Sequence, residues 1–374
     1  MRIDTVRLVN KRKRGELVIS DIMIKPIWSD SMGAKSFSLF IDTGDARILI
    51  DPGVSAMQPS FPISDSKKYE YAEKALSQIT KYARQANIVT ITHYHYDHFR
   101  PTFPELYAGK IVLAKDPNQF INESQRERAV DFYTLLSDRF LGKKLEFSER
   151  KNKIIGENPL QELPRAMSIN YGDYTERKRE LLNKGMKWYN NLVEKWNRWP
   201  EIPEIETDRV KWIFADGKTF KFGTTKIRFM KPMFHGIEFS RVGWVIPIVI
   251  EKGSVKILYT SDLNGPIIED YAEWIIRENP DVLFIDGPAT YMIPYTLNMI
   301  NFRRSVENLK RIIRNVKAKY IFLDHHLTRD IRFRVRLKEV YELARKEKKI
   351  ITFSEFHGRK AIAEKVYLAK KKKK

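Results

Sequence analysis

The chain has 374 residues and a formal net charge of +21, from 68 Lys and Arg against 47 Asp and Glu. This length can bury a large core in one elaborated domain or two, and no run of eighteen apolar residues indicates a membrane span. The absence of cysteine excludes disulfides, iron–sulfur clusters and a thiol nucleophile, while the positive charge favours a polyanionic partner such as RNA or DNA or reflects the ion-rich composition of a thermophile's protein.

The N-terminal part of the chain predicts two β-hairpins. Apolar and polar residues alternate over residues 2–27 around a basic turn at 11–15, and the runs 37–41 and 46–50 flank a Thr-Gly-Asp turn. The second hairpin leads into Asp51, which precedes Pro and Gly as a turn-forming aspartate does. Because the first residues lack the apolar stretch of a signal peptide, we expect a soluble, cytoplasmic protein.

A strand–helix–strand alternation follows. Apolar residues at helical spacing predict an amphipathic helix over 67–86, the β-branched run 87–92 is typical of a buried strand, and 111–114 predicts another short strand.

The loop after the strand at 87–92 carries the strongest chemical signal. Residues 92–98, Thr-His-Tyr-His-Tyr-Asp-His, hold three of the seven histidines and a carboxylate within six consecutive positions. Imidazole nitrogen and carboxylate oxygen are ligands that zinc, and with less preference manganese or iron, accepts from proteins. If this segment is a loop, His93 and His95 can point at one ion while Asp97 and His98 turn toward a second.

The chain changes character between residues 116 and about 205, where long charged side chains and helical patterning predict a mostly helical insertion. Within it, apolar and aromatic residues recur every three or four positions over 181–196 among basic residues. This pattern is either a platform for nucleic acid or the core stripe and solvated face of an ordinary helix, and we favour the core stripe. The position of the insertion suggests a lid over the metal loop.

After the insertion, apolar strands end in polar residues of metal-ligand type. The strands are expected at 218–222, 227–230, 242–250, 255–259, 282–285 and 320–323. The polar residues at or near their ends are His235, Asp262, Asp286, Asp324, His325 and His326. Several strands that deliver such residues to one sheet edge indicate a convergent site. Amphipathic helices are expected around 306–316 and 335–344, and the lysine run at 369–374 is expected to be a disordered tail.

The metal loop resembles the His-x-His-x-Asp-His signature of the metallo-β-lactamase superfamily. Together with Ile-Asp-Pro-Gly at 50–53 and Leu-Asp-His-His-Leu at 323–327, it looks like an archaeal branch of predicted metal-dependent hydrolases. The resemblance implies an α/β fold, a four-layer αβ/βα sandwich, which we expect as a single domain over residues 1–368 with the insertion at about 116–205. It supplies a fold and a metal site, and no substrate.

The same resemblance implies a role for each candidate residue. The first metal site takes His93, His95 and His235; the second takes Asp97, His98 and a last histidine; Asp262 bridges both ions; and Asp51 buttresses the metal loop without binding metal. Outside the resemblance, His235 would be a structural histidine and Asp262 a turn-capping aspartate.

Three further residues have alternative roles. We prefer His325 as the last ligand, because it lies nearer the strand and its spacing to Arg329 looks like the superfamily's terminal motif, and His326 then donates a proton or contacts substrate. Asp286 and Asp324 either orient a ligand imidazole through its free N–H or are turn residues. The residues expected to take part in catalysis are Asp97, Asp262 and His326.

Two divalent ions, zinc first with manganese or iron as alternatives, imply a hydrolase that uses a hydroxide bridged by both ions. The chain contains no Walker A loop and no dinucleotide-binding Gly-x-Gly-x-x-Gly. The positive charge favours a phosphodiester of nucleic acid or a nucleotide. The alternative is a small-molecule ester, lactone or thioester, and a third hypothesis is a non-catalytic nucleic-acid-binding protein. Only about 60 residues separate Asp262 from His325, which is too few for the large cap domain of one group of nucleases in the superfamily.

Overall fold

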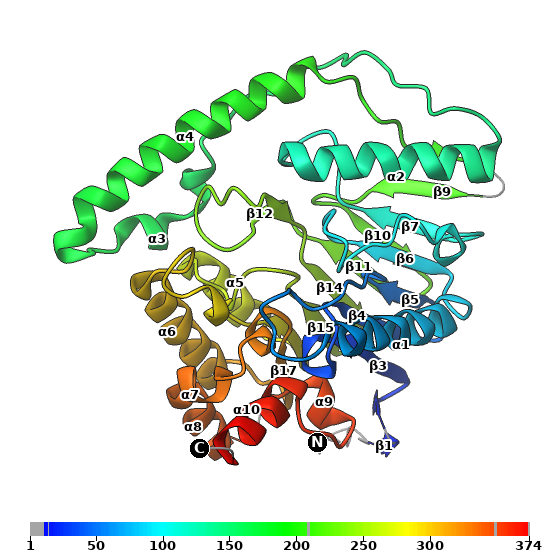
Figure 1. Ribbon diagram of the computed structural model, residues 1–374. Helices are drawn as coiled ribbons and strands as arrows, with labels where there is room; N and C mark the ends of the chain where they lie inside the picture. Colours follow the sequence, from blue (N-terminus) through cyan, green and yellow to red (C-terminus); the bar gives the residue numbers. More distant parts are fainter. Residues whose placement is uncertain (1–10, 14, 208–209, 348–349, 373–374) are drawn as a thin grey trace, which may run out of the picture.

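The computed structural model describes residues 11–13, 15–207, 210–347 and 350–372. Two large β-sheets pack face to face in this part of the chain, and helices cover their outer faces (Figure 1). This arrangement is the αβ/βα sandwich that the sequence predicts. Among the described helices, none combines the length and the apolar character that crossing a bilayer requires.

The first sheet is antiparallel at its N-terminal end and parallel around the metal loop. Its strand order is β1 (Lys11–Lys13), β2 (Glu16–Ile19), β3 (Ile22–Ser29), β4 (Phe37–Asp42), β5 (Arg47–Ile50), β6 (Ile88–Ile91), β7 (Ile111–Ala114), β9 (Lys211–Phe214) and β8 (Ile205–Glu206). Strands β5, β6, β7 and β9 are parallel neighbours. The hairpin β4–β5 is confirmed. The predicted turn at 11–15 is wrong in part, because residues 11–13 pair with β2 as a strand; the predicted strand residues 2–10 lie outside the described residues.

The second sheet carries the C-terminal ligand candidates. Its order is β10 (Thr219–Phe222), β11 (Thr225–Phe229), β14 (Ile248–Lys252), β15 (Val255–Tyr259), β16 (Val282–Asp286), β17 (Tyr320–Asp324) and β18 (Ile350–Ile351). A separate ribbon pairs β12 (Met233–Phe234) with β13 (Trp244–Val245). The single strand predicted over 242–250 is therefore wrong. It divides into β13 and β14 around Pro247, which has no N–H to donate to a sheet.

The α-helices are α1 (Asp65–Ala83), α2 (Glu123–Leu141), α3 (Pro164–Ser168), α4 (Thr175–Arg198), α5 (Glu269–Glu278), α6 (Met299–Asn315), α7 (Phe333–Arg336), α8 (Lys338–Glu347), α9 (Phe353–Phe356) and α10 (Ile362–Lys372). The helices predicted over 67–86 and 306–316 correspond to α1 and α6, and the one predicted around 335–344 divides into α7 and α8. The structure contradicts the disordered tail at residues 369–372, which continue α10; residues 373–374 lie outside the described part.

Adjacent residues of the buried strands serve two different cores. Ile48 and Ile88 belong to the apolar cluster between the sheets, whereas their neighbours Leu49 and Val89 belong to the cluster on the helix side. This is the two-residue period of a strand that is covered on both faces. It explains why these strands read as continuous apolar runs in the sequence.

The insertion is mostly helical, and α4 runs as one long helix diagonally over the upper left of the molecule (Figure 1). Its face toward the protein buries Tyr189, Leu192 and Trp196, and both aromatic rings contact Trp244, with centroids 6.2 and 5.7 Å from that ring. The structure thus places these aromatic side chains in the core, as the core-stripe interpretation predicts. Gly185 lies on the same face, where an added Cβ would come within 2.5 Å of the Phe239 ring.

We expect Gly185→Ala to destabilise the protein, although alanine is the better helix former by about 1 kcal/mol. The methyl group would overpack the contact with Phe239, at a cost of about 1–3 kcal/mol. The measurement is the free energy of unfolding in urea, with Asn190→Ala on the exposed face of α4 as the control. Equal stabilisation by both substitutions would show that α4 is not tightly docked.

Candidate metal centre

The candidate ligands follow strand ends that face one another. His93 follows β6, which is parallel to β5, while Asp262 and His325 follow β15 and β17, which flank β16 in a parallel arrangement. Parallel strands bring their carboxyl ends to the same edge of a sheet. His235 arrives separately at the end of the ribbon strand β12. The fold therefore gathers residues that are far apart in the sequence.

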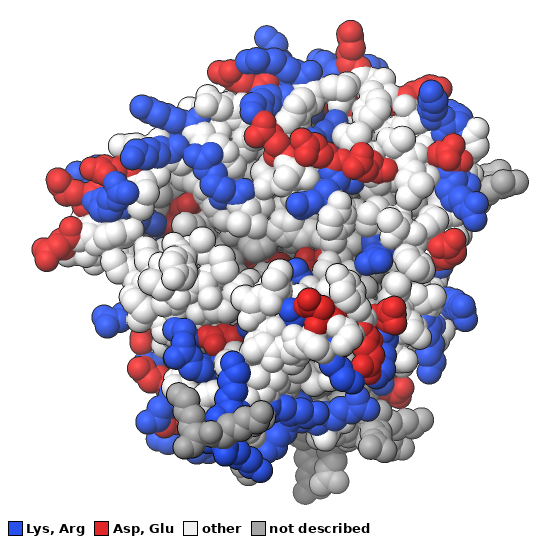
Figure 2. All heavy atoms as spheres, viewed as in Figure 1, with Lys and Arg blue, Asp and Glu red and all other residues white. Residues whose placement is uncertain are grey.

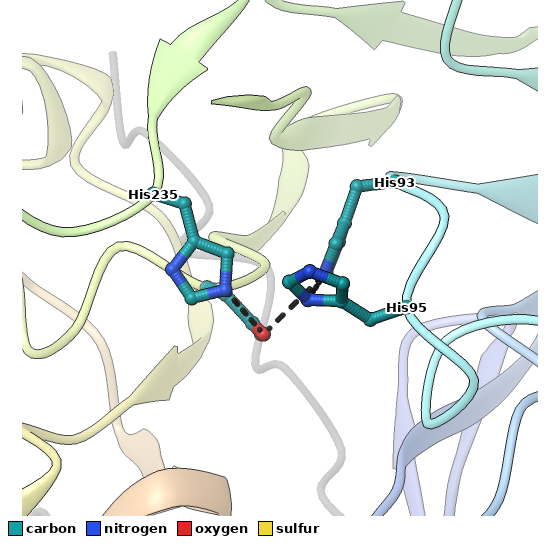
Figure 3. A group of neighbouring side chains, drawn as sticks. His93, His95 and His235 are labelled. Atoms are coloured by element: carbon teal, nitrogen blue, oxygen red, sulfur yellow. Dashed lines mark hydrogen bonds and ion pairs between the residues drawn. The ribbon is translucent and has the colours of Figure 1, made fainter. Parts of the chain in front are cut away.

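The first group consists of His93, His95, His235 and Asp262. Figure 3 shows the ring nitrogens of the three histidines turned toward one carboxylate oxygen. The Nε2 atoms of His93 and His235 lie 3.5 and 3.2 Å from Asp262 Oδ2, and His93 Nε2 lies 2.9 Å from His95 Nδ1. Two atoms that each bind a tetrahedral ion at about 2.1 Å lie roughly 3.4 Å apart, so these separations suit a common metal ion.

The second group consists of Asp97, His98 and His325. The Nε2 atoms of His98 and His325 are 3.2 Å apart, and Asp97 Oδ2 lies 3.8 Å from His325 Nε2. Asp262 also touches this group, with Oδ2 3.1 Å from His98 Nε2 and Oδ1 3.5 Å from His325 Nε2. Asp262 thus lies between the two groups, as expected of a bridging carboxylate.

Several buried polar atoms in the described part lack a hydrogen bond, and three of them converge here: both carboxylate oxygens of Asp262 and Nε2 of His235. A buried carboxylate without donors is costly unless a cation compensates it. Because these orphaned atoms face neighbouring imidazoles, the residues fit divalent metal ions.

The two histidines that open the metal loop are held in the neutral form that binds metal. Burial, assisted by His98, keeps the pKa of His93 well below its usual range, and burial, with His235 nearby, lowers the pKa of His95 to about 3. Asp97 is held ionised: burial would raise its pKa, but Arg329 and then His98 hold it well below its usual range. These three residues are therefore in the protonation state that binds a cation.

Burial would lower the pKa values of His98 and His325, but Asp262 raises the pKa of His98 well above its usual range and Asp30 raises the pKa of His325 to about 10. These two histidines must therefore lose a proton when a metal ion binds.

Asp51 holds the metal loop from behind. Its Oδ1 accepts from Thr92 N–H at 2.8 Å, and its Oδ2 accepts from the hydroxyls of Thr92 and Tyr259 at 2.6 and 2.8 Å. His98 Nδ1 lies 2.8 Å from the same Oδ2, which leaves Nε2 directed at the metal group. Asp51 therefore contacts the metal loop at Thr92 and His98, and its role as a buttress that does not bind metal stays a prediction from the resemblance.

Both histidines of the last motif reach the centre, on different sides. His325 Nδ1 lies 3.1 Å from Asp30 Oδ1 and 3.0 Å from Ser36 O, so its Nε2 faces the second group. His326 Nδ1 lies 3.2 Å from Asp286 Oδ2, and its Nε2 lies 3.7 Å from Asp262 Oδ2. His325 thus belongs to the second group and also forms a third possible metal-binding group with Asp262 and His326, so the choice of His325 as the last ligand stays a prediction. Asp286 contacts the imidazole of His326.

Asp324 does not contact an imidazole, and the expectation that it orients one is wrong. Its carboxylate accepts from the backbone N–H groups of Ser31, His325 and Phe353 and from the hydroxyl of Thr328. His325 and Thr328 belong to the turn after β17, whereas Ser31 and Phe353 come from segments that pack against this turn. Asp324 therefore shapes the backbone that presents His325, which is the turn-residue alternative.

Asp30, which lies in the 3₁₀ turn Asp30–Met32 after β3, is not among the residues predicted from the sequence. Its buried carboxylate accepts from Ser36 N–H at 2.9 Å, contacts His325 Nδ1 and pairs with Arg329 Nε. Arg329 also donates to Asp97 Oδ2 at 2.7 Å. No motif marks Asp30, because its partners come from the far end of the chain.

Gly53 leaves room for the metal loop. A Cβ at this position would lie 2.3 Å from the backbone nitrogens of His98 and Phe99.

We expect Gly53→Ala to lower both the zinc uptake and the melting temperature, because backbone atoms cannot rotate away as a side chain can. Elemental analysis and thermal unfolding measure the two effects. The control is Gly109→Ala, where nothing lies within 4 Å and only strain from φ +67° is added. Unchanged zinc uptake in Gly53→Ala would contradict the tight packing of this turn on the loop.

Comparisons with known proteins identify the family of this chain. The family model described as the metallo-beta-lactamase superfamily matches residues 33–100. A UPF0282 protein of Korarchaeum cryptofilum is 32% identical over 335 residues, covering 89% of this chain and 88% of the relative. A UPF0282 protein of Methanocaldococcus jannaschii is 30% identical over 354 residues, covering 91% and 94%. Among solved structures, the short form of human tRNase Z matches at 13% identity with a TM-score of 0.30, covering 78% of this chain and 86% of that one. The chain therefore belongs to the UPF0282 family, archaeal proteins of the metallo-β-lactamase superfamily.

Proposed function

We propose that this protein is a hydrolase that cleaves a phosphodiester of nucleotide size, with two divalent metal ions held by the two groups around Asp262. The superfamily consists largely of metal-dependent hydrolases, and the clustered His and Asp residues fit divalent metal. The observation that carries the proposal is the buried carboxylate of Asp262, which has no hydrogen bond to either oxygen and lies between two sets of imidazoles.

In the proposed assignment His93, His95 and His235 hold the first ion, Asp97, His98 and His325 hold the second, and Asp262 contacts both. All donors are nitrogen or oxygen, which suits zinc first and manganese or iron as alternatives. Ions at such a site make a water molecule acidic enough to attack near neutral pH and withdraw charge from the bond under attack.

His326 is the group we assign to proton transfer. Asp286 Oδ2 is held by Asn264 N–H at 2.8 Å and accepts from His326 Nδ1, which fixes the tautomer and leaves Nε2 free. That Nε2 lies 3.7 Å from Asp262 Oδ2, and His326 belongs to neither of the two groups described above, although it forms a third possible metal-binding group with Asp262 and His325. A histidine oriented in this way can accept a proton from the attacking water at Nε2 and then give that proton to the leaving oxygen of the substrate.

The charge around the site supports a small substrate over a long polymer. Figure 2 shows a hollow below α4. The surface below this hollow is largely uncharged, and acidic side chains of α2 lie above it. The exposed residues Glu123, Glu127 and Asp131 follow one another at four-residue spacing on that helix. Lys and Arg side chains form a band along the lower edge of this face, over the C-terminal helices, and others lie over α4 at the upper left (Figure 2). A track of cations along a nucleic-acid backbone would need the opposite arrangement.

The same uncharged surface favours a second candidate function, the hydrolysis of a small-molecule ester, lactone or thioester at the same centre. A non-catalytic nucleic-acid-binding protein is the weakest alternative, because the ligand set is complete.

We expect His325→Ala to lose one of two bound ions, because His325 belongs to the second group, and His326→Ala to keep both ions while its turnover falls. Elemental analysis of the purified variants gives the stoichiometry. The opposite result for the two variants would mean that the last motif is shifted by one residue.

We expect metal-dependent cleavage of bis(4-nitrophenyl) phosphate with zinc, manganese or iron, and a loss of at least about 100-fold in rate for Asp262→Ala, equivalent to roughly 3 kcal/mol. Both metal groups lose a contact in this variant. Asp138→Ala, an exposed carboxylate on α2, is the control and should retain full activity. Site-dependent hydrolysis of lactones or thioesters, with no cleavage of phosphodiesters under any of the three metals, would favour the small-molecule alternative.

A further inference from the structure

One side chain of the insertion joins the two segments that carry the histidines of the first group. Gln125 lies in the first turn of α2 and is 1% exposed. Its Oε1 accepts from the backbone N–H of Tyr94, the residue between His93 and His95, at 2.9 Å. Its Nε2 donates to the backbone carbonyl of Val242 at 2.7 Å. One buried amide therefore contacts both segments and satisfies a donor on one and an acceptor on the other.

The second of these segments leads directly to His235. The backbone N–H of His235 donates to Gly243 O at 3.0 Å, so the carbonyl that receives Gln125 belongs to the residue beside the partner of His235. Asn122, the N-cap of α2, reinforces the link by donating to the carbonyls of Arg241 and Val242 at 2.8 and 3.0 Å. The position of the segment after β12 thus depends on the first turn of α2.

Helix α4 holds the middle of the same segment. Lys178 pairs with the buried carboxylate of Glu238 at 2.6 Å, and Arg304 of α6 pairs with Glu238 from the other side at 2.6 Å. Gly185 packs against Phe239 in the contact described above. Both long helices of the insertion, α2 and α4, therefore contact residues between His235 and Gly243.

We propose that Gln125 is a positioning residue of the metal centre, and that the insertion acts as a scaffold for the first group of ligands instead of a mobile lid. The inference rests on the proposed function in that it takes His93, His95 and His235 as metal ligands. His93 and His95 come from the first sheet and His235 from a separate ribbon, so their convergence needs a link between backbones of different elements. A buried amide with both ends bonded fixes such a distance, because moving either segment leaves a buried polar group unpaired.

The test compares two substitutions of Gln125 with a control. Gln125→Met keeps the length and most of the volume of the side chain but removes both hydrogen bonds. Gln125→Glu keeps the acceptor for Tyr94 N–H and loses the donor to Val242. Gln119→Met is the matched control, because Gln119 bonds Asp116 through its Nε2 and contacts neither ligand segment through its side chain. The readouts are zinc affinity by chelator competition, the visible spectrum of the Co²⁺-loaded protein, and urea unfolding of the metal-free protein.

We expect Gln125→Met to weaken zinc binding about 10- to 100-fold, as loss of groups that orient metal ligands does, and to change the Co²⁺ spectrum. Gln125→Glu should fall between Gln125→Met and wild type, and Gln119→Met should match wild type. If Gln125→Met lowers only the stability of the metal-free protein and retains wild-type zinc affinity and Co²⁺ spectrum, Gln125 is merely structural and the inference is overturned alone. If Gln125→Met does not fold, wild-type zinc affinity in Gln125→Glu has the same consequence. A wild-type protein that takes up no metal would overturn the proposed function together with this inference.

Discussion

A buried carboxylate surrounded by imidazoles is the constraint around which the rest of the structure is arranged. The Asp262 side chain is 1% exposed, and its oxygens receive no hydrogen bond, yet ring nitrogens of four histidines lie between 3.1 and 3.7 Å from Oδ2. Such a charge is tolerated in a protein interior when a cation compensates it. Metal binding is thus the simplest physical account of why this carboxylate is kept out of water.

Three residues at the site have strained backbone conformations. Asp51, Ser261 and His325 follow three of the strands and have φ values of 46°, 52° and 58°, in the left-handed region that non-glycine residues rarely adopt. Each such residue costs about 1–3 kcal/mol and persists only where its surroundings enforce it. Here the enforcing contacts are those of Asp51 with Thr92 and of His325 with Asp30. These backbone conformations change the direction of the chain just after the strands, where the candidate site residues lie.

The insertion and the charge distribution bear on the kind of substrate. Helix α4 is docked through an aromatic core and through the buried pair of Lys178 with Glu238. The acidic row on α2 lies above the hollow, while a band of Lys and Arg side chains lies over the C-terminal helices. The net charge of +21 is therefore not the local charge around the metal groups. The Lys and Arg side chains over the C-terminal helices can have a role that is separate from the hydrolysis of a small ester.

The sequence alone determined the metal loop, because His93, His95, Asp97 and His98 lie within six residues and their relation is local. It also determined the alternation of strands and helices, since a strand covered on both faces needs a continuous apolar run and a surface helix needs an apolar stripe. The polar residues at or near the ends of these strands include His235, Asp262 and Asp286, which the structure brings together around His326 and the metal loop.

Only the tertiary structure decided which partners those residues meet. Asp30 and His325 are 295 residues apart and touch because β3 and β17 end at the same place in the folded chain. The partners of Gln125 are also distant in the sequence. No feature of an amphipathic helix indicates that one of its glutamines links Tyr94 and Val242. The different roles of Asp286 and Asp324, both strand-end aspartates in sequence, likewise depend on which side chains the neighbouring strands present. Local spacing encodes elements and ligand types, whereas the contacts between distant segments depend on the packing of the two sheets.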